Sequence, residues 1–161
     1  MTLNFKKVMD VIEFFNGYFR KEFIVTGTAA LAIQGFSIEE FHDVDIILND
    51  TLENRRKLEV WKKFFPNNCL GYDNKVDGWS FNVNDHRIDI FLKPIKGIEV
   101  IETTSDHLVF YTKPALNIIK IKAKYNRCKD ICFFKKHSEK IKAMLFDELR
   151  SNHDDIIKML F

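Results

Sequence analysis

Two aspartates stand in a segment that otherwise suits burial in a core. In residues 43–49, DVDIILN, Asp43 and Asp45 are separated by one valine and followed by an apolar run. Residues two apart on a strand share a face, so both carboxylates project from one face while the alternating apolar residues pack inward from the other. The pattern predicts a strand that presents a pair of carboxylates, a ligand type that divalent cations prefer.

A third aspartate, Asp89, stands in a second segment of the same design. Residues 86–92 read HRIDIFL, in which Ile88, Ile90 and Leu92 form one face. Arg87, Asp89 and Phe91 share the other face. If the two strands are neighbours, three carboxylates converge, and a divalent cation offsets their mutual repulsion. Ligation by oxygen alone suits Mg²⁺ or Mn²⁺, and two such ions can clamp both oxygens of an in-line phosphoryl displacement. The three aspartates are therefore candidate metal ligands and catalytic residues.

The segments that must position these carboxylates alternate between helical and strand patterns. Apolar spacing and turn residues predict helices at 4–20, 28–35, 51–65, 114–136, 138–149 and 152–160, and strands at 22–27, 43–49, 97–103 and 107–112. Residues 67–92 are expected to form paired strands with turns at Asn68, Gly71, Asp77-Gly78 and Asn84-Asp85. This order predicts an α/β protein, in which a mixed sheet is flanked by helices and extended at the C-terminus by further helices.

Composition bounds the class of protein. The 161 residues are 46% hydrophobic and 14% aromatic, which excludes a disordered chain and suffices for a domain with a core. No apolar run reaches the roughly 18 residues that span a bilayer, and residues 1–10 lack the apolar segment of a signal peptide. The three cysteines lack the spacing and histidine partners of a zinc site. We therefore expect a cytoplasmic protein with reduced thiols and no membrane partner.

The net charge of +2 is unevenly distributed along the chain. Residues 112–161 carry twelve Lys or Arg and six Asp or Glu, a net charge of +6, whereas residues 1–111 carry a net charge of −4. An acidic part joined to a basic part suits a site in which carboxylates hold a metal and lysines meet phosphate. A solvated basic helical face is the alternative interpretation of the same charges.

The order of these motifs resembles the DNA polymerase beta-like nucleotidyltransferase superfamily. Its pattern is a strand, a glycine turn, a helix, a strand with two aspartates and a later strand with a third, which here reads VTGTAALAIQG, HDVDIIL and RIDIF. The resemblance implies that Gly27 lets the backbone approach a nucleotide phosphate and that Thr28 offers its hydroxyl and backbone N–H. It also implies that Asp43 and Asp45 hold two ions, Mg²⁺ or Mn²⁺, and that Asp89 ligates the ion nearer the acceptor.

The basic segment KPALNIIKIKAKYNRCKD, residues 113–130, is similar to a helix of AbiEii-like and minimal toxin-type nucleotidyltransferases. The K-x-x-A-x-x-x-R pattern of that helix begins here at Lys120 and ends at Arg127, which implies that both residues bind the nucleotide. Helical spacing places Lys120 and Lys122 on different faces, and the family pattern favours Lys120.

These resemblances imply a nucleotidyltransferase-like catalytic core, residues 1–112, and a basic helical extension, residues 113–161, packed on the core. The implied reaction is Mg²⁺-dependent transfer of a nucleoside monophosphate from an NTP such as ATP to an acceptor hydroxyl, with release of pyrophosphate. The expected acceptor is RNA, tRNA ends in particular, or a protein. The toxin-type relatives imply a role in toxin–antitoxin systems or phage defence, with a cognate antitoxin or a second copy in a homodimer as partner.

Other functions fit parts of the sequence. The arginine and the Ser or Thr that such families often carry before the first aspartate are absent from residues 39–42, which favours a catalytically inactive nucleotide-binding or interaction protein on the same fold. Relatives of the fold also serve small-molecule acceptors such as antibiotics. A glycosyltransferase with Mn²⁺ on its aspartate pair would leave Asp89 without a role, and a haloacid-type phosphatase would leave the Gly-Thr turn without one.

Overall fold

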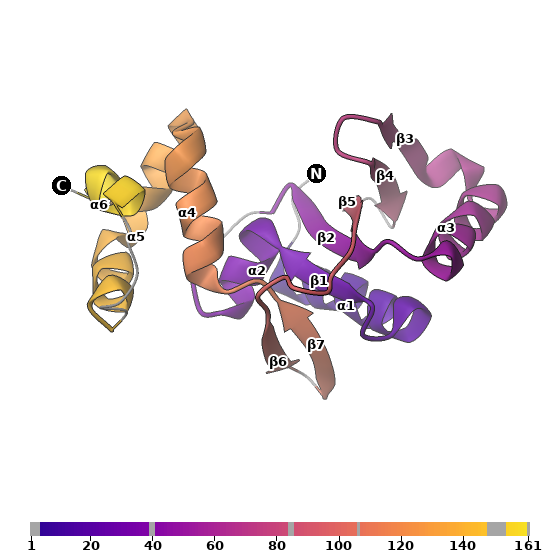
Figure 1. The fold of residues 1–161 in the computed structure, drawn as a ribbon, viewed down its shortest axis with the longest axis horizontal. Helices are drawn as coiled ribbons and strands as arrows, with labels where there is room; N and C mark the ends of the chain where they lie inside the picture. Colours follow the sequence, from indigo (N-terminus) through magenta and orange to yellow (C-terminus); the bar gives the residue numbers. More distant parts are fainter. Residues whose placement is uncertain (1–3, 39–40, 84–85, 106, 148–153, 161) are drawn as a thin grey trace. The chain divides into compact units, whose positions relative to one another are not determined.

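The chain divides into two compact units, Met1–Lys113 and Pro114–Phe161 (Figure 1). The computed structural model describes residues 4–38, 41–83, 86–105, 107–147 and 154–160. The sequence places the boundary between residues 112 and 113, and the packing of the second unit on the first stays a prediction. Among the described residues, no helix combines the length and the apolar character needed to cross a membrane.

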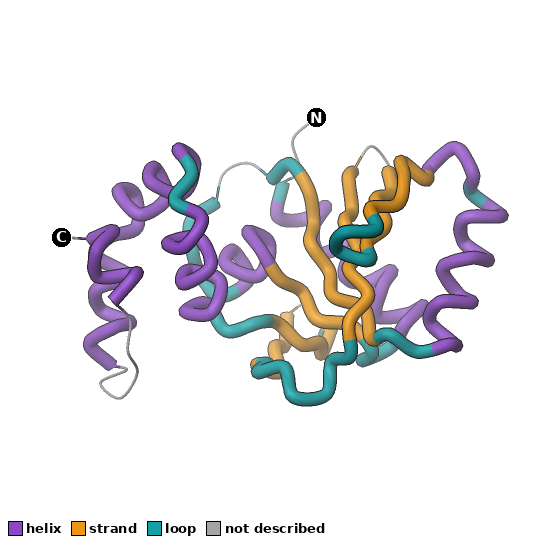
Figure 2. Tube along the Cα trace, turned by 45° about the horizontal axis from the view of Figure 1, so that its top comes forward, coloured by secondary structure: helices purple, strands orange, loops and turns teal. Residues whose placement is uncertain are grey.

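The first unit is built on one mixed sheet whose seven described strands follow the order β3-β4-β5-β2-β1-β7-β6 (Figures 1 and 2). Its elements are α1 (Phe5–Phe19), β1 (Phe23–Thr26), α2 (Gly27–Ile33), β2 (Asp43–Asn49), α3 (Leu52–Phe64), the 3₁₀ turn η1 (Pro66–Asn68), β3 (Cys69–Asp73), β4 (Gly78–Val83), β5 (His86–Lys93), β6 (Ile101–Ser105) and β7 (Leu108–Thr112). The pairs β2–β5 and β1–β7 are parallel, and the other pairs are antiparallel. The predicted α/β class, with a mixed sheet flanked by helices, is confirmed.

Aromatic side chains of α1 and α3 cover one face of this sheet. Phe15 of α1 lies 5.8 Å from Phe23 of β1, and Trp61 of α3 stacks on Phe81 of β4 at 4.5 Å between ring centroids. The covered face is fully buried along its central strands, by Val25, Val44, Ile46, Leu48, Ile88 and Ile90. Burial of bulky side chains on this face stabilises the unit, and the opposite face of β2 and β5 carries the polar side chains of both strands together with buried Ile47.

Strand and turn predictions between residues 67 and 103 are partly wrong. Gly71 lies inside β3 at a positive φ of 148°, where the pairing with β4 shifts register, so it makes an irregularity in the strand and not a turn. Asp77 lies in a turn as predicted, with a φ of 48°. The strand expected at residues 97–103 begins only at Ile101. The turn expected at residues 84–85 lies outside the described residues.

The second unit contains α4 (Ala115–Tyr125), α5 (Cys128–Asp147) and α6 (Asp154–Leu160). The single helix predicted for residues 114–136 is wrong, because Asn126 takes a left-handed conformation (φ 50°, ψ 41°) and ends α4 with a hydrogen bond from its N–H to the carbonyl of Lys122. Asparagine tolerates this conformation, and the continuing basic pattern concealed the end. The break predicted near residue 137 is a kink at His137 within α5 (φ −111°, ψ 18°).

Candidate metal and nucleotide site

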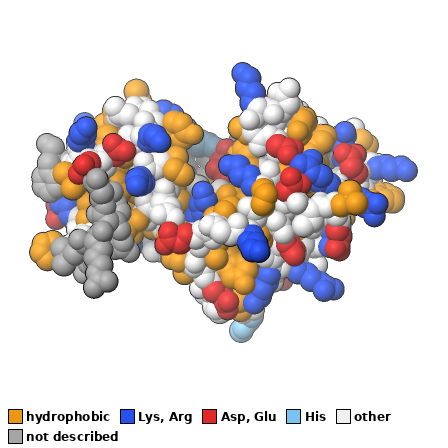
Figure 3. Space-filling view, viewed as in Figure 1, with side chains coloured by type: hydrophobic (Ala, Val, Ile, Leu, Met, Phe, Trp, Pro, Cys, Tyr) orange, Lys and Arg blue, Asp and Glu red, His pale blue; other side chains and the backbone are white. Residues whose placement is uncertain are grey.

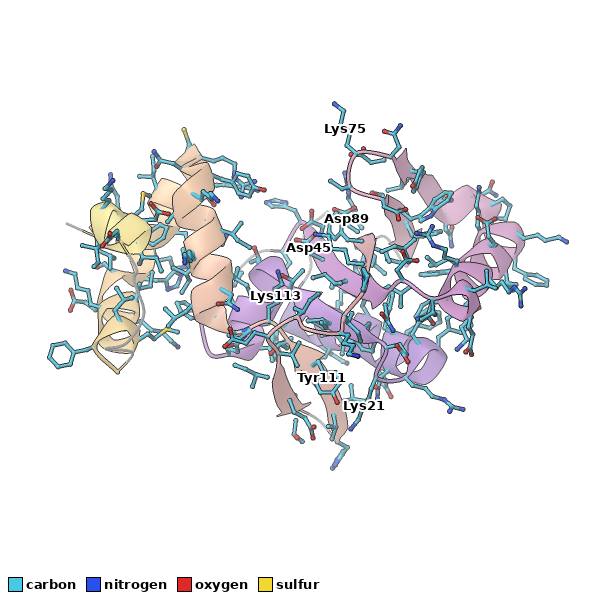
Figure 4. All side chains as sticks on the ribbon, viewed as in Figure 1. Lys21, Asp45, Lys75, Asp89, Tyr111 and Lys113 are labelled. Carbon is cyan, nitrogen blue, oxygen red and sulfur yellow. The ribbon has the colours of Figure 1, made fainter. Side chains whose placement is uncertain are left out.

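The three sequence-predicted aspartates meet on the face of the sheet that α1 and α3 leave uncovered. Because β2 and β5 are parallel neighbours, Asp45 lies directly opposite Asp89 and Asp43 lies opposite Arg87. One carboxylate oxygen from each aspartate lies within 4.8 Å of the others, and all three side chains are half-buried. Figure 4 shows Asp45 and Asp89 side by side on these strands. The predicted convergence of the three carboxylates is confirmed.

Asp89 is held by two donors on a single oxygen. The hydroxyl of Ser80 donates to Asp89 Oδ1 at 2.6 Å, and Arg87 Nε donates to the same oxygen at 3.0 Å. The hydrogen bond to Asp89, and then the charges of Asp43 and Asp45, raise the pKa of Arg87 above its ordinary value. Arg87 therefore supplies part of the positive charge that three clustered carboxylates require.

Gly27 joins β1 to α2 at the point where the chain passes Asp45. Thr26, the last residue of β1, pairs with Asp45, and Gly27 follows at a φ of +67°. A β-carbon at position 27 would collide with Asp45 Oδ2 and would lie 3.2 Å from Asp45 Cγ. Both the backbone conformation and the close approach require glycine. Thr28, in the first turn of α2, is half-buried beside it.

The donor set fits a divalent cation with a preference for oxygen. Ion–oxygen distances of about 2.0–2.6 Å place two ligands of one ion up to about 4–5 Å apart, which is compatible with the spacing of the three carboxylates. Three carboxylates also provide the charge that Mg²⁺ or Mn²⁺ needs without a nitrogen or sulfur ligand. The residues present therefore suit the metal predicted from the sequence.

Acidic and basic side chains are interspersed on the face of the first unit that Figure 3 shows. The net acidic charge of residues 1–111 is therefore not gathered there into one continuous acidic surface. The three clustered aspartates are a local feature, which the arrangement of strands creates from side chains that are far apart in the sequence.

The two basic residues predicted to bind the nucleotide lie in the second unit, and their part in the site stays a prediction. Lys120 is exposed on α4, whereas Lys122 is half-buried with its Nζ 3.6 Å from Asp130, as expected for residues on different faces. Arg127 donates two side-chain hydrogen bonds to fully buried Asp130, from Nε to Oδ2 at 2.8 Å and from Nη2 to Oδ1 at 3.3 Å. Burial lowers the pKa of Lys122, although Asp130 acts in the opposite direction. Both predicted ligands are exposed, and Arg127 differs in being paired with Asp130.

Ser80 was missed by sequence reasoning, and Arg87 was placed correctly on the aspartate face but given no role. Alternation along β5 is visible in the sequence and was enough to place Arg87 beside Asp89. The contact of Ser80 depends on the pairing of β4 with β5, in which Ser80 lies opposite Asp89. No local signal in the sequence specifies that partner.

Two solved structures share this arrangement of strands and helices. One is a proposed nucleotidyltransferase from Thermotoga maritima, with a TM-score of 0.58 and 12% identity over 84% of this chain and 94% of that chain. The chain has the nucleotidyltransferase fold. The other structure is an antigenic nucleotidyltransferase-like protein from Paracoccidioides brasiliensis, with a TM-score of 0.51 and 14% identity over 99% of this chain and 78% of that chain.

The sequence itself matches no protein-family model and no curated protein. At 12% and 14% identity, the likeness to the two solved structures concerns the nucleotidyltransferase fold alone. A function on that fold must be argued from the site residues of this chain.

Proposed function

We propose that this protein is a metal-dependent nucleotidyltransferase, which moves a nucleoside monophosphate from an NTP to an acceptor hydroxyl and releases pyrophosphate. The observation that supports this most strongly is the meeting of Asp43, Asp45 and Asp89 on adjacent strands of a nucleotidyltransferase fold, with one oxygen of each within 4.8 Å of the others. A carboxylate triad of this kind is suited to hold two divalent ions around a phosphoryl group.

In this proposal, Asp43 and Asp45 hold both ions, Mg²⁺ or Mn²⁺, and Asp89 holds the one nearer the acceptor. When bound, the ions offset the charge of the triphosphate and favour the ionised form of the acceptor hydroxyl. Asp89 also accepts the hydroxyl proton, for which its half-buried carboxylate is suitably placed among the ligands. The protein accelerates the reaction mainly by aligning the two reactants and by stabilising the charge that develops in the transition state.

The phosphates of the nucleotide lie, in the same proposal, against Gly27 and Thr28. Lack of a side chain at Gly27 lets the Asp45 carboxylate lie against the backbone of the turn, so the turn lies directly beside the proposed metal ligands. Lys120 and Arg127 bind the β- and γ-phosphates by charge-assisted hydrogen bonds. Lys120 is the first of the two to test, because Arg127 already pairs with Asp130.

We propose RNA, tRNA ends in particular, or a protein as the acceptor. Residues 113–142 carry ten Lys or Arg and two acidic residues, which suits a polyanionic substrate. A cytoplasmic role in toxin–antitoxin systems or phage defence, with a cognate antitoxin or a second copy as partner, follows from the resemblance to toxin-type enzymes and belongs to the same proposal.

A catalytically inactive nucleotide-binding or interaction protein is the second candidate. It is favoured by the residues before Asp43, Glu39-Glu40-Phe41-His42, which lack the arginine and the Ser or Thr of many relatives. Residues 39 and 40 lie outside the described residues. This candidate predicts nucleotide binding without release of pyrophosphate.

Transfer of α-labelled NTPs into total cellular RNA and protein, with Mg²⁺, tests the proposal. The Asp43→Asn, Asp45→Asn double variant is the blank. We expect label in one of the two fractions with the native chain only. Nucleotide binding without transfer to RNA, protein or small-molecule extracts would instead support the inactive candidate, whereas transfer to an extract component would identify a small-molecule acceptor.

A further inference from the structure

The two oxygens of Asp89 have different surroundings. Oδ1 accepts hydrogen bonds from Ser80 Oγ at 2.6 Å and from Arg87 Nε at 3.0 Å. Within the part of the chain that the structure describes, no donor bonds to Oδ2, although the side chain is only 14% exposed. Oδ2 is not one of the fully buried side-chain atoms without a partner, so water or a ligand can reach it. Oδ2 is therefore the oxygen of Asp89 that remains for a ligand from outside the chain.

Ser80 and Arg87 differ in how firmly they can fix Oδ1. Ser80 lies directly opposite Asp89 in the antiparallel β4–β5 pair, so its Cβ is fixed on the same face and one torsion places its hydroxyl. A separation of 2.6 Å is typical of a strong hydroxyl–carboxylate hydrogen bond. The Arg87 side chain is 56% exposed and flexible, and it also interacts with the charges of Asp43 and Asp45. Ser80 is thus the more rigid of the two donors.

We propose that Ser80 is a positioning residue of the metal site, which holds Oδ1 of Asp89 so that Oδ2 faces the divalent cation. The inference rests on the proposed metal-dependent function and adds a residue to it. Hydrogen-bond partners of metal-binding side chains commonly change metal affinity 10–100-fold when they are removed. Ser80 has no contact with the substrate in this scheme and acts only through Asp89.

The position next to Ser80 allows a conservative variant. Gly71 of β3 is the register partner of Ser80 on the other side, and a β-carbon added at Gly71 would meet no heavy atom within 4 Å. Ser80→Thr keeps the hydroxyl and adds one methyl group, and its partner position Gly71 has no side chain for that methyl group to meet. Ser80→Ala removes the hydroxyl and little else. Comparison of these two variants distinguishes the effect of losing the hydrogen bond from the effect of a changed strand packing.

The test is titration of the full chain with Mn²⁺ alone, with free Mn²⁺ followed by electron paramagnetic resonance. We expect Ser80→Ala to weaken the Asp43-dependent binding about tenfold, and Ser80→Thr to leave it within about twofold of the native chain. Ser105→Ala, a serine of β6 in the same sheet, is the matched control and should bind like the native chain. Thermal melts of each variant establish that the chain is folded.

A double-mutant cycle with Asp89→Asn distinguishes action through Asp89 from a general structural effect. If Ser80 acts only through Asp89, Ser80→Ala has no further effect on Mn²⁺ affinity in the Asp89→Asn background. An equal loss in both backgrounds, or no loss in the native background, overturns the inference and leaves the proposed function standing. Absence of any Asp43-dependent binding by the native chain would contradict the proposed metal centre itself.

Discussion

Gly27 lies so close to Asp45 that a β-carbon at position 27 would collide with the carboxylate oxygen Oδ2. The contact arises because Thr26 pairs with Asp45 across β1 and β2, and the chain then turns with Gly27 at a φ of +67°. The glycine of the turn and the second aspartate of the pair are therefore one structural unit. A change at Gly27 must reach the proposed metal site through Asp45.

Gly27→Ala is expected to damage both stability and metal binding. The left-handed conformation costs a residue with a β-carbon about 1–2 kcal/mol, and the collision displaces the Asp45 carboxylate in addition. Urea unfolding and Mn²⁺ titration measure the two effects. Gly17→Ala is the matched control, because Gly17 is exposed in α1 with open space at its β-carbon, and alanine there should stabilise by about 0.5–1 kcal/mol. Equal Mn²⁺ affinity in both variants would contradict the account of Gly27.

Asp45→Asn is expected to reduce the stabilisation that the metal gives. Without metal, the substitution removes one of three neighbouring like charges and also the attraction of Asp45 to Arg87, and these effects oppose one another, so the melting temperature should change little. Mg²⁺ at about 100 times its Kd should stabilise the native chain by about 2.7 kcal/mol and the variant by much less. Thermal melts in EDTA and in Mg²⁺ provide the comparison. Asp10→Asn, at an exposed position of α1, should respond to Mg²⁺ as the native chain does.

Lys120→Gln is expected to weaken nucleotide binding. Loss of one charge-assisted hydrogen bond to phosphate should raise the KM for the NTP about tenfold, equivalent to about 1.4 kcal/mol. Steady-state transfer kinetics measure KM and kcat separately. Lys135→Gln removes an exposed lysine of α5 and should leave KM unchanged. The proposed role of Lys120 fails if the two variants have the same KM.

The ion pairs around Asp130 predict a specific response to acid. Burial alone would raise the pKa of Asp130, but hydrogen bonds from the side chain and backbone of Arg127 outweigh burial and lower it. A lowered folded pKa means that this stabilisation is complete above the ordinary pKa of about 3.9 and is lost as pH falls through the folded value.

Arg127→Gln removes the charged guanidinium and its hydrogen bonds to Asp130 and should raise the pKa of Asp130, so that acid unfolding of the variant begins at a higher pH. Urea unfolding followed by circular dichroism over about pH 2–6 measures the shift. Lys129→Gln, which changes an exposed neighbour, is the control for loss of one positive charge. Identical acid profiles for Arg127→Gln and Lys129→Gln would show that the pairing with Asp130 contributes nothing to the pH dependence.

Alternation along two strands predicted which side chains share a face, and the carboxylate cluster followed on the condition that the two strands are neighbours. The period of two fixes which side chains share a face, and the apolar partners of Asp43, Asp45 and Asp89 all bury on the covered face. The cross-strand contact of Ser80 could not be predicted in the same way. A slip of one residue in the β4–β5 pairing would turn Ser80 to the other face, and no feature within the strand fixes that register.

The helical end of the chain was harder to predict for a different reason. Apolar residues continue at helical spacing on both sides of Asn126, so the pattern gives no sign of the left-handed residue that ends α4. The sequence pattern also predicts both Lys120 and Arg127 as phosphate ligands and does not distinguish between them. Only side-chain packing distinguishes exposed Lys120 from Arg127, which is paired to a buried carboxylate.

Diffraction from crystals soaked with Mn²⁺ and a non-hydrolysable NTP analogue tests the central claim most directly. We expect anomalous peaks within about 2.0–2.6 Å of carboxylate oxygens of Asp43, Asp45 and Asp89, with two ions about 3.5–4 Å apart when the analogue is bound. Analogue bound without Mn²⁺ between these carboxylates, or Mn²⁺ held only by other acidic residues, would contradict the claim.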